Sequence, residues 1–304
     1  MLRLTLRELE VFVAVATQGT VTRAAEVIGL TQSAASQALD KLEGGLGVKL
    51  FDRVGRRLAL NEHGRQLLPR ARSMLDAAQD MQGLFHDQAF RLRVAASTTI
   101  ANYLLPVQLA AFQARWPQAR LELSVGNTRD TVAAVASLDV DFGFIEGACH
   151  HPDLLVEPWC DDELLVFVAP THPLAGRKVH VDELAGADWL LREPGSGTRE
   201  EIERLLLPHV PGLTVNMELG HPEAIKNAVA AGLGVSCLSR RVLAQELATG
   251  RVVPVRAALP ALKRTLYRIR HRDKGITRGM QAFFDLRAPA RPRATGRVRL
   301  PARA

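Results

Sequence analysis

Four hydrogen-bonding side chains, Gln32, Ser33, Ser36 and Gln37, recur at positions i, i+1, i+4 and i+5 of a segment that favours a helix. Residues with this spacing lie on one face of an α-helix, here near its N-terminus. Amide and hydroxyl groups on such a face suit hydrogen bonds to base edges and phosphates in the major groove of DNA. An ordinary solvated helix face is the alternative, so the neighbouring elements must decide between the two.

Two short helices are expected before this segment. Thr5 and Glu8 form a capping box that begins the first helix, and Gly19 ends it. Thr20 begins the second helix, which ends at Gly29. The helix that carries the polar face should then start at the cap Thr31.

The polar helix is expected to run to about Glu43, where the pair Gly44 and Gly45 terminates it. Residues 49–51 and 57–60 then indicate two strands joined at Val54-Gly55-Arg56. Arg53, Arg56 and Arg57 lie near the tip of this hairpin, where they could neutralise phosphates or enter the minor groove. A helix-turn-helix followed by a basic wing favours DNA binding over the solvated-face interpretation.

The run LRELEVFVAVATQGTVTRAAEVIGLTQSAASQALDKLEGGLGVKLFDRVGRRLALNEHG, at residues 6–64, resembles the DNA-binding module of LysR-type transcriptional regulators. It departs from the common pattern at Ser33, often proline, at Gln37, often arginine or lysine, and at Asn61, usually threonine. Gln37 therefore leaves one phosphate contact of the family unsupported. The expected DNA-binding residues are Thr31, Gln32, Ser33, Ser36, Gln37, Lys41, Arg53, Arg56 and Arg57.

A long helix is expected after the cap Asn61, over residues 62–88. Its apolar residues follow the spacing of a heptad seam, which two chains could bury together: Leu67, Ala71, Met74, Ala78, Met81 and Phe85. The alternative is a helix packed on its own chain. The resemblance implies a linker helix that pairs two DNA-binding heads, with homodimers assembling into homotetramers. Pro69 lies inside this helix and should kink it or weaken one backbone hydrogen bond.

From Leu92 onward, short apolar strands alternate with helices, which predicts an α/β architecture. The expected strands are residues 92–96, 121–125, 142–145, 164–169, 189–192, 214–219, 235–238 and 266–270. The resemblance implies two lobes, like those of a periplasmic binding protein, with the chain crossing near Asp162 and returning near Thr265. The expected effector-binding domain is 89–286, with lobe I at about 89–162 and 266–286 and lobe II at about 163–265.

Two expected helix starts could bind an anion through free backbone N–H groups and hydroxyls. One is Ser97-Thr98-Thr99, and the other is Gly195-Ser196-Gly197-Thr198, where Thr198 and Glu201 suggest a second capping box. Each start taken alone favours an ordinary cap over an anion site. Two such starts, one in each lobe, favour a pocket for a small anion or carboxylate. The strings at 190–206 and 220–241 look like the family branch of Calvin-cycle and sulfite-responsive regulators, which implies a small anionic or carboxylate co-inducer. The expected contacts are Ser97, Thr98, Thr99, Asn127, Thr128, Glu146, Ser196, Gly197, Thr198 and Glu223.

Length and charge fit this interpretation. A chain of 304 residues predicts about two domains. Its net charge of +7 lies mostly in residues 287–304, which hold six arginines and no acidic residue and are expected to be a disordered, basic tail. The absence of an export signal and three widely spaced cysteines predict the cytoplasm.

An enzyme and an exported solute-binding protein are the alternatives. Cys149, His150, His151 and Asp153 could be imagined as a metal site, but neighbouring loop histidines do not form one ligand face. Ser196 could suggest a nucleophilic serine, but the sequence shows no general base to activate it. No phosphate-binding or dinucleotide-binding fingerprint is present. We therefore expect no enzyme activity, no metal and no cofactor. The expected partners are promoter DNA, a small effector and RNA polymerase, with no membrane.

Overall fold

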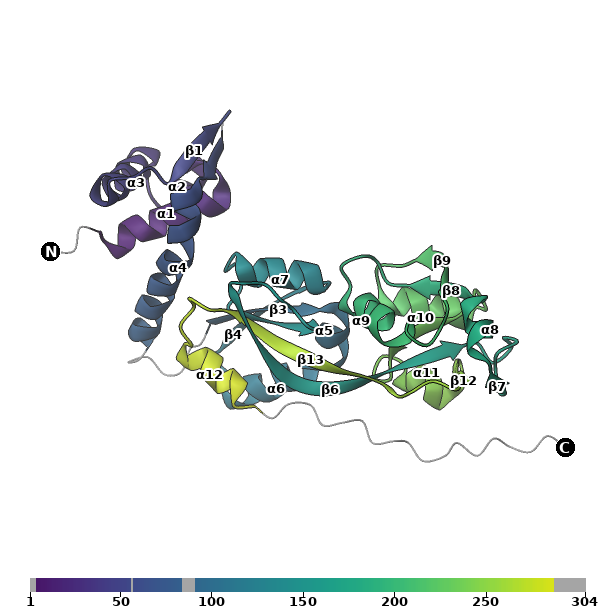
Figure 1. Cartoon of the computed structure of the whole chain (residues 1–304). Helices are drawn as coiled ribbons and strands as arrows, with labels where there is room; N and C mark the ends of the chain where they lie inside the picture. The colour runs from purple at the N-terminus through teal and green to yellow at the C-terminus, as the bar shows by residue number, and fades with distance from the viewer. Residues whose placement is uncertain (1–3, 56, 84–90, 287–304) are drawn as a thin grey trace.

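The computed structural model describes residues 4–55, 57–83 and 91–286 (Figure 1). A small N-terminal part, mostly helical, is connected by the long helix α4 to a larger α/β part with two lobes. Arg56, Phe85 and the basic tail lie outside the described residues. The elements of the N-terminal part are α1 (Leu6–Gln18), α2 (Val21–Val27), α3 (Gln32–Leu46), β1 (Phe51–Val54), β2 (Arg57–Leu60) and α4 (Glu62–Gly83).

Local capping signals set the starts of the first three helices. Thr5 and Glu8 form the expected capping box, and Thr20 and Thr31 cap α2 and α3 through their hydroxyls. Gly19 ends α1 in the left-handed region, with φ 71°. These three starts and this end confirm the helices predicted from the sequence.

The predicted end of α3 is wrong. The helix continues through Gly44 and Gly45 to Leu46, and Gly47 takes the left-handed conformation with φ 72°. Glycine can adopt helical angles at a modest cost, so a glycine pair does not by itself stop a helix. Beyond this end, the buried Glu43 carboxylate holds the chain close to α3, because it accepts a hydrogen bond from the Leu50 backbone N–H at 2.9 Å.

The wing begins later than expected. Its first strand is β1 (Phe51–Val54) rather than residues 49–51, because Glu43 holds Lys49 and Leu50 against α3 instead. Strand β2 coincides with the predicted second strand, and Phe51 pairs with Leu60 across the hairpin. The turn includes Gly55 in the left-handed region, with φ 61°.

The expected seam of α4 is divided between two environments. Leu67 and Ala71 pack into the core of the N-terminal part of their own chain, together with side chains such as Phe12. Met74 and Met81 are 45% and 60% exposed. The own-chain interpretation is therefore correct for the first half of the seam, while pairing with a second chain stays a prediction for the second half.

The larger part contains one seven-stranded sheet and small strand pairs. We call lobe I the elements β3 (Arg91–Ser97), α5 (Thr98–Tyr103), α6 (Leu105–Arg115), β4 (Arg120–Gly126), α7 (Thr128–Ala136), β5 (Phe142–Glu146) and α12 (Arg278–Phe284). Lobe II contains β7 (Lys178–Val179), α8 (Val181–Ala185), β8 (Asp188–Leu191), α9 (Gly197–Leu206), β9 (Thr214–Glu218), α10 (Pro222–Ala230), β10 (Ser236–Ser239), α11 (Ala244–Thr249), β11 (Val253–Pro254) and β12 (Arg256–Ala257).

Two long antiparallel strands connect the lobes (Figure 1): β6 (Leu154–Val168) and β13 (Leu262–His271). The sheet order is β10-β6-β13-β5-β3-β4, so both lobes attach to the same pair. The prediction found only one end of each long strand, because polar residues interrupt the apolar pattern where the lobes meet. It missed the two-residue strands β7, β11 and β12. Among the described residues, none of the helices combines the length and the hydrophobicity that a membrane span requires.

Each lobe has its own apolar core. In lobe I, Phe112, Phe142 and Phe283 pack together, with ring centroids 5.3–5.4 Å apart for the two pairs that include Phe283. In lobe II, the fully buried Trp189 and Ile202 belong to a separate core. Separate cores allow the lobes to move as units about the shared strands.

Substitutions at two glycines test how closely α4 packs against the wing. A Cβ on Gly64 would lie 2.2 Å from the Leu50 carbonyl oxygen and 2.7 Å from the Leu60 side chain, whereas one on Gly44 would meet nothing within 4 Å. Gly64→Ala should therefore lower the free energy of unfolding by about 1–3 kcal/mol. Gly44→Ala, the matched control, should raise it by up to about 1 kcal/mol. Urea unfolding of the full chain measures both, and equal effects would contradict this packing.

Candidate functional site

The polar face of α3 is open to solvent. Gln32, Ser33, Gln37 and Lys41 are exposed, and Ser36 is half-buried. The helix is held from behind by buried apolar residues of the same core as α1. Its polar side chains are therefore available to a partner.

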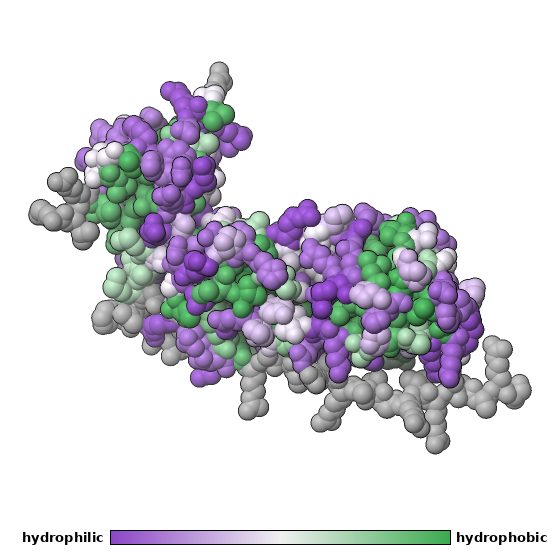
Figure 2. All heavy atoms as spheres, in the orientation of Figure 1, coloured by the Kyte–Doolittle hydropathy of each residue, from purple (hydrophilic) through white to green (hydrophobic). Residues whose placement is uncertain are grey.

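Thr31 has a structural role besides its predicted one. Its hydroxyl accepts a hydrogen bond from the Ala34 N–H at 3.2 Å and lies 3.1 Å from the Ser33 hydroxyl. Arg53 and Arg57 are exposed on the two wing strands, where hydrophilic side chains gather (Figure 2). The Leu58 N–H donates to the Gly19 carbonyl at 2.8 Å and so ties the wing to the end of α1.

Most of the predicted effector contacts meet where the two lobes face each other. Ser97, Thr98 and Thr99 lie at the junction of β3 and α5, and Thr128 and Glu146 lie on α7 and β5 of the same lobe. From lobe II, the first turn of α9 brings its own polar residues to this place: Ser196, Gly197 and Thr198. All of these residues are buried: Gly197 packs its backbone against Glu146, and each of the others has at most 6% of its surface exposed.

A buried ion-pair network joins the lobes at this place. The Arg264 guanidinium of β13 is fully buried and lies 2.7 Å from the Glu146 carboxylate and 2.8 Å from that of Asp162. Arg264 also donates to the Thr198 hydroxyl at 3.1 Å, and that hydroxyl donates to Glu146. We call Glu146, Asp162, Thr198 and Arg264 the interlobe network.

The interlobe network keeps Glu146 ionised. Burial alone would raise the pKa of the Glu146 carboxyl, but the Arg264 charge, the hydroxyls of Thr198 and Ser97, and the Arg192 charge together hold the pKa below its usual range. The predicted effector contact Glu146 therefore has its partners within the protein.

Backbone contacts also bring the lobes together. The Arg129 N–H of α7 donates to the Gly195 carbonyl at 3.1 Å. Within lobe I, the Thr128 hydroxyl lies 3.5 Å from the Glu146 carbonyl, which faces lobe II. A Cβ on Gly197 would lie only 2.1 Å from that same carbonyl oxygen. Only glycine fits there while the lobes stay in contact.

Three predicted residues have structural partners. Asn127 caps α7, accepting from the Asp130 N–H at 3.0 Å. Glu223 accepts a hydrogen bond from the Tyr103 hydroxyl of the other lobe and pairs with Lys226. The predicted capping box of Thr198 is wrong, because Ser196 is the N-cap residue and the Thr198 hydroxyl reaches Glu146 instead. Its supposed partner Glu201 pairs with Arg204 at 2.6 Å.

Two buried arginines were not predicted from the sequence. Arg264 holds the interlobe network, and Arg192 follows β8 with its side chain only 2% exposed. Within the described residues, Arg192 Nη1 and Thr99 Oγ1 are buried and have no hydrogen-bond partner. Unpaired donors this deeply buried are unusual in native proteins. The signal for Arg192 was a charged residue directly after the apolar end of a strand.

Two of the three cysteines are buried or half-buried thiols of low reactivity. Burial raises the pKa of the Cys160 thiol to about 11 and that of Cys237 to about 12. Neither is a thiolate near neutral pH, so neither is an efficient nucleophile. Among the described residues no group of histidine, cysteine and carboxylate side chains is arranged to hold a metal, and the His151 ring accepts from the Asp153 N–H.

Breaking the interlobe network should be costly. Glu146→Gln leaves Arg264 buried with Asp162 as its sole carboxylate partner in the network, so the free energy of unfolding should fall by about 3 kcal/mol at neutral pH. Because folding lowers the pKa of Glu146, its contribution is present above the unfolded pKa and is lost as pH falls. Urea unfolding should therefore show the gap between wild type and variant narrowing below about pH 4.

The matched control for that variant is Glu157→Gln. Glu157 pairs with Arg268 on the surface, with 43% of its side chain exposed. A surface pair contributes about 0–1 kcal/mol, so this change should be small. Equal losses from the two variants would contradict a specific role of the interlobe network.

The two parts of the chain match two family descriptions. Residues 6–65 match the bacterial regulatory helix-turn-helix protein of the lysR family, and residues 87–289 match the LysR substrate binding domain. The uncharacterized HTH-type transcriptional regulator YeiE of Escherichia coli K12 is 50% identical over 289 residues, covering 95% of this chain and 99% of the relative. The RuBisCO operon transcriptional regulator of Allochromatium vinosum is 32% identical over 93% of this chain and 95% of its own.

Solved structures agree with the fold. A full-length OxyR variant from Pseudomonas aeruginosa has a TM-score of 0.76 at 26% identity and covers 94% of this chain and 95% of its own. The CcmR regulatory domain of Synechocystis PCC6803, in complex with 2-PG, has a TM-score of 0.59 at 31% identity, covering 64% of this chain and 94% of its own. These matches confirm the predicted resemblance and two-lobed architecture, and the chain belongs to the LysR family of bacterial transcriptional regulators.

Proposed function

We propose that this regulator reads promoter DNA with the polar face of α3 and the arginines of the wing, and that a small oxyanion or carboxylate bound between the lobes controls it. The proposal for DNA rests on the exposure of Gln32, Gln37 and Arg53 on one module that the N-terminal core holds rigid. Amide side chains suit base edges, and arginines suit phosphates.

Pairing of two heads is part of the proposal. Met74 and Met81, exposed on the second half of α4, offer an apolar surface to the same helix of a second chain. Two heads one helical turn apart would fit a roughly palindromic operator. We propose a homodimer, assembling into a homotetramer, that acts on transcription in the cytoplasm together with RNA polymerase.

The buried unpaired donors carry the proposal for the effector. Arg192 Nη1 supplies a positive charge and Thr99 Oγ1 a hydroxyl, both buried and without a partner among the described residues. The first turn of α9 adds backbone N–H groups and the positive end of the helix dipole. An oxyanion or carboxylate would satisfy all three kinds of donor. The relative CcmR, described as a complex with 2-PG, supports this ligand class.

Control of DNA binding would follow from differential affinity. A ligand that contacts Thr99 on lobe I and the α9 turn on lobe II binds the closed arrangement more tightly than an open one. It therefore shifts the population of molecules toward closed lobes. We propose that this shift changes the spacing or angle of the paired DNA heads.

Two substitutions separate phosphate from base contacts. Arg53→Ala should weaken binding to every DNA sequence and reduce the slope of log K against log salt by about 1. Gln32→Ala should instead relax sequence preference, at a cost of about 1–3 kcal/mol on the preferred site. Fluorescence anisotropy with specific and scrambled duplexes across a salt series measures both.

Arg256→Ala is the control for these DNA measurements, because Arg256 is exposed on lobe II, far along the chain from the DNA-reading elements. It should change neither the affinity nor the salt slope. Unchanged DNA binding in Arg53→Ala and Gln32→Ala together would show that another surface contacts the groove.

The effector proposal predicts anion-dependent stabilisation. A thermal-shift screen of sulfite, sulfate, phosphate, 2-phosphoglycolate and small carboxylates should find a compound that stabilises the full chain by about 2.7 kcal/mol at 100 times its dissociation constant. Arg192→Gln should abolish the shift, because it removes the buried charge. Arg177→Gln, which alters an exposed arginine of lobe II paired with Glu183, should retain it. Equal shifts in both variants would place the anion elsewhere.

A further inference from the structure

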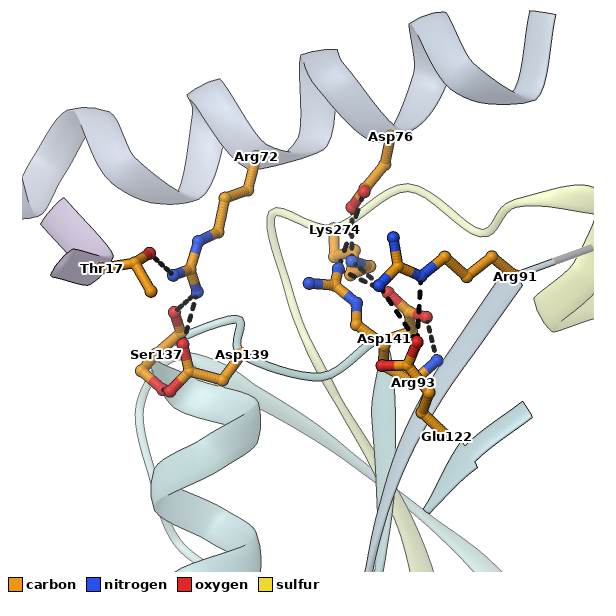
Figure 3. Close-up of polar contacts among 10 residues, drawn as sticks. All are labelled: Thr17, Arg72, Asp76, Arg91, Arg93, Glu122, Ser137, Asp139, Asp141 and Lys274. Carbon is orange, nitrogen blue, oxygen red and sulfur yellow. Dashed lines mark hydrogen bonds and ion pairs between the residues drawn. The ribbon is translucent and has the colours of Figure 1, made fainter. Parts of the chain in front are cut away.

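Helix α4 contacts lobe I of its own chain through two charged residues one helical turn apart, Arg72 and Asp76 (Figure 3). The Arg72 guanidinium donates to the Ser137 carbonyl and lies 3.0 Å from the Asp139 carboxylate. It also lies 3.4 Å from the Thr17 hydroxyl of α1. One side chain thus touches the DNA-binding part, the connecting helix and lobe I.

Asp76 contacts a second set of charges on lobe I. Its carboxylate lies 2.5 Å from Lys274 Nζ and 3.7 Å from Arg93 Nη2. Asp141 pairs with the same two cations, at 2.8 Å and 3.1 Å. The Lys274 side chain is only 1% exposed, so it depends on these two carboxylates. We call Arg72, Asp76 and these partners on lobe I, with Ser137 and Asp139, the linker contact.

The linker contact is narrow. Cavities of about 430 and 690 Å³, each lined by residues of both α4 and lobe I, border it. Beside Ser137, the buried Leu138 has φ 60°, the one positive value among the described non-glycine residues. A leucine in the left-handed region is strained and needs its surroundings to hold it there. A polar contact on a strained loop is easier to break than an apolar interface.

The same elements that carry the linker contact also reach the place where the lobes meet. Helix α7 spans about 13 Å, from the interlobe residue Thr128 to the loop at Ser137. Strand β5 runs from Phe142, next to Asp141, to Glu146 of the interlobe network. Strands β3 and β13 also connect the two places. On β3, Arg93 is in the linker contact and Ser97 lies where the lobes meet. Strand β13 carries Arg264 of the interlobe network, and Lys274 of the linker contact follows it.

We propose that the linker contact is the route by which a change between the lobes reaches α4 and the DNA-binding part of the same chain. Regular elements such as α7 and β5 move as rigid units, so a shift at their interlobe ends must appear at their other ends. Ion pairs with defined partners then either hold α4 in place or release it. The proposal needs only the interlobe contacts and not the identity of an effector.

The test uses hydrogen exchange of the full-length protein without any ligand. Gly197→Ala inserts a methyl group between the lobes, 2.1 Å from the Glu146 carbonyl oxygen. Exchange of the amides of residues 68–79 on α4 should change by about fivefold or more, the lower end of usual coupling between sites. Thr198→Val, which removes the interlobe hydroxyl without adding volume, provides a second perturbation if the first variant does not fold.

Cutting the linker contact should remove this response. In an Arg72→Gln, Asp76→Asn background, the interlobe substitution should no longer change exchange on α4, while its effect on the first turn of α7 persists. Arg70→Gln, an exposed arginine on the same helix, should leave the response intact. The proposal is overturned if α4 never responds, if it responds equally in the cut background, or if Arg70→Gln abolishes the response. Failure to find an effector would not affect any of these outcomes.

Discussion

The fully buried Arg264 is the charge on which the arrangement of the two lobes depends. A guanidinium removed from water must be paired on several sides, and it takes Glu146 from lobe I, Asp162 from the crossing strand and the Thr198 hydroxyl from lobe II. The lobes cannot separate at this point without leaving at least one of these charges buried and poorly paired. The polar residues that interrupt the apolar pattern of the long strands are the ones that meet this requirement.

The same requirement explains why the lobes meet on glycine and on small hydroxyl residues. For Thr198 to reach Glu146, the first turn of α9 must lie directly against the end of β5, and the absence of a side chain at Gly197 permits that approach. Charges also organise the other end of lobe I, where Lys274 is shared by Asp76 and Asp141. Lobe I is thus a rigid apolar body with a polar contact at each end.

How much could be predicted from the sequence depended on how local each signal was. Caps such as Thr5 and Thr31 act within one turn, so the helix starts followed directly from the residues. The end of α3 did not, because glycine adopts helical and left-handed angles alike, and the residue type alone does not say which of Gly44, Gly45 and Gly47 ends the helix. Arg264 and Glu146 are 118 positions apart, and no local pattern reveals that they meet. The family resemblance placed the cleft, but only the fold shows that Glu146 is already paired.

The division between paired and unpaired groups constrains what an effector could do. Had Glu146 and Arg264 been the ligand contacts, binding would exchange one ion pair for another and gain little. Because the members of the interlobe network already pair with one another, an incoming anion would instead meet Arg192 Nη1 and Thr99 Oγ1, which have no partner to give up. Its contacts would add to those that already hold the lobes together. A ligand bound in this way strengthens an existing closed arrangement, and its whole differential affinity is available to act on the DNA-binding heads.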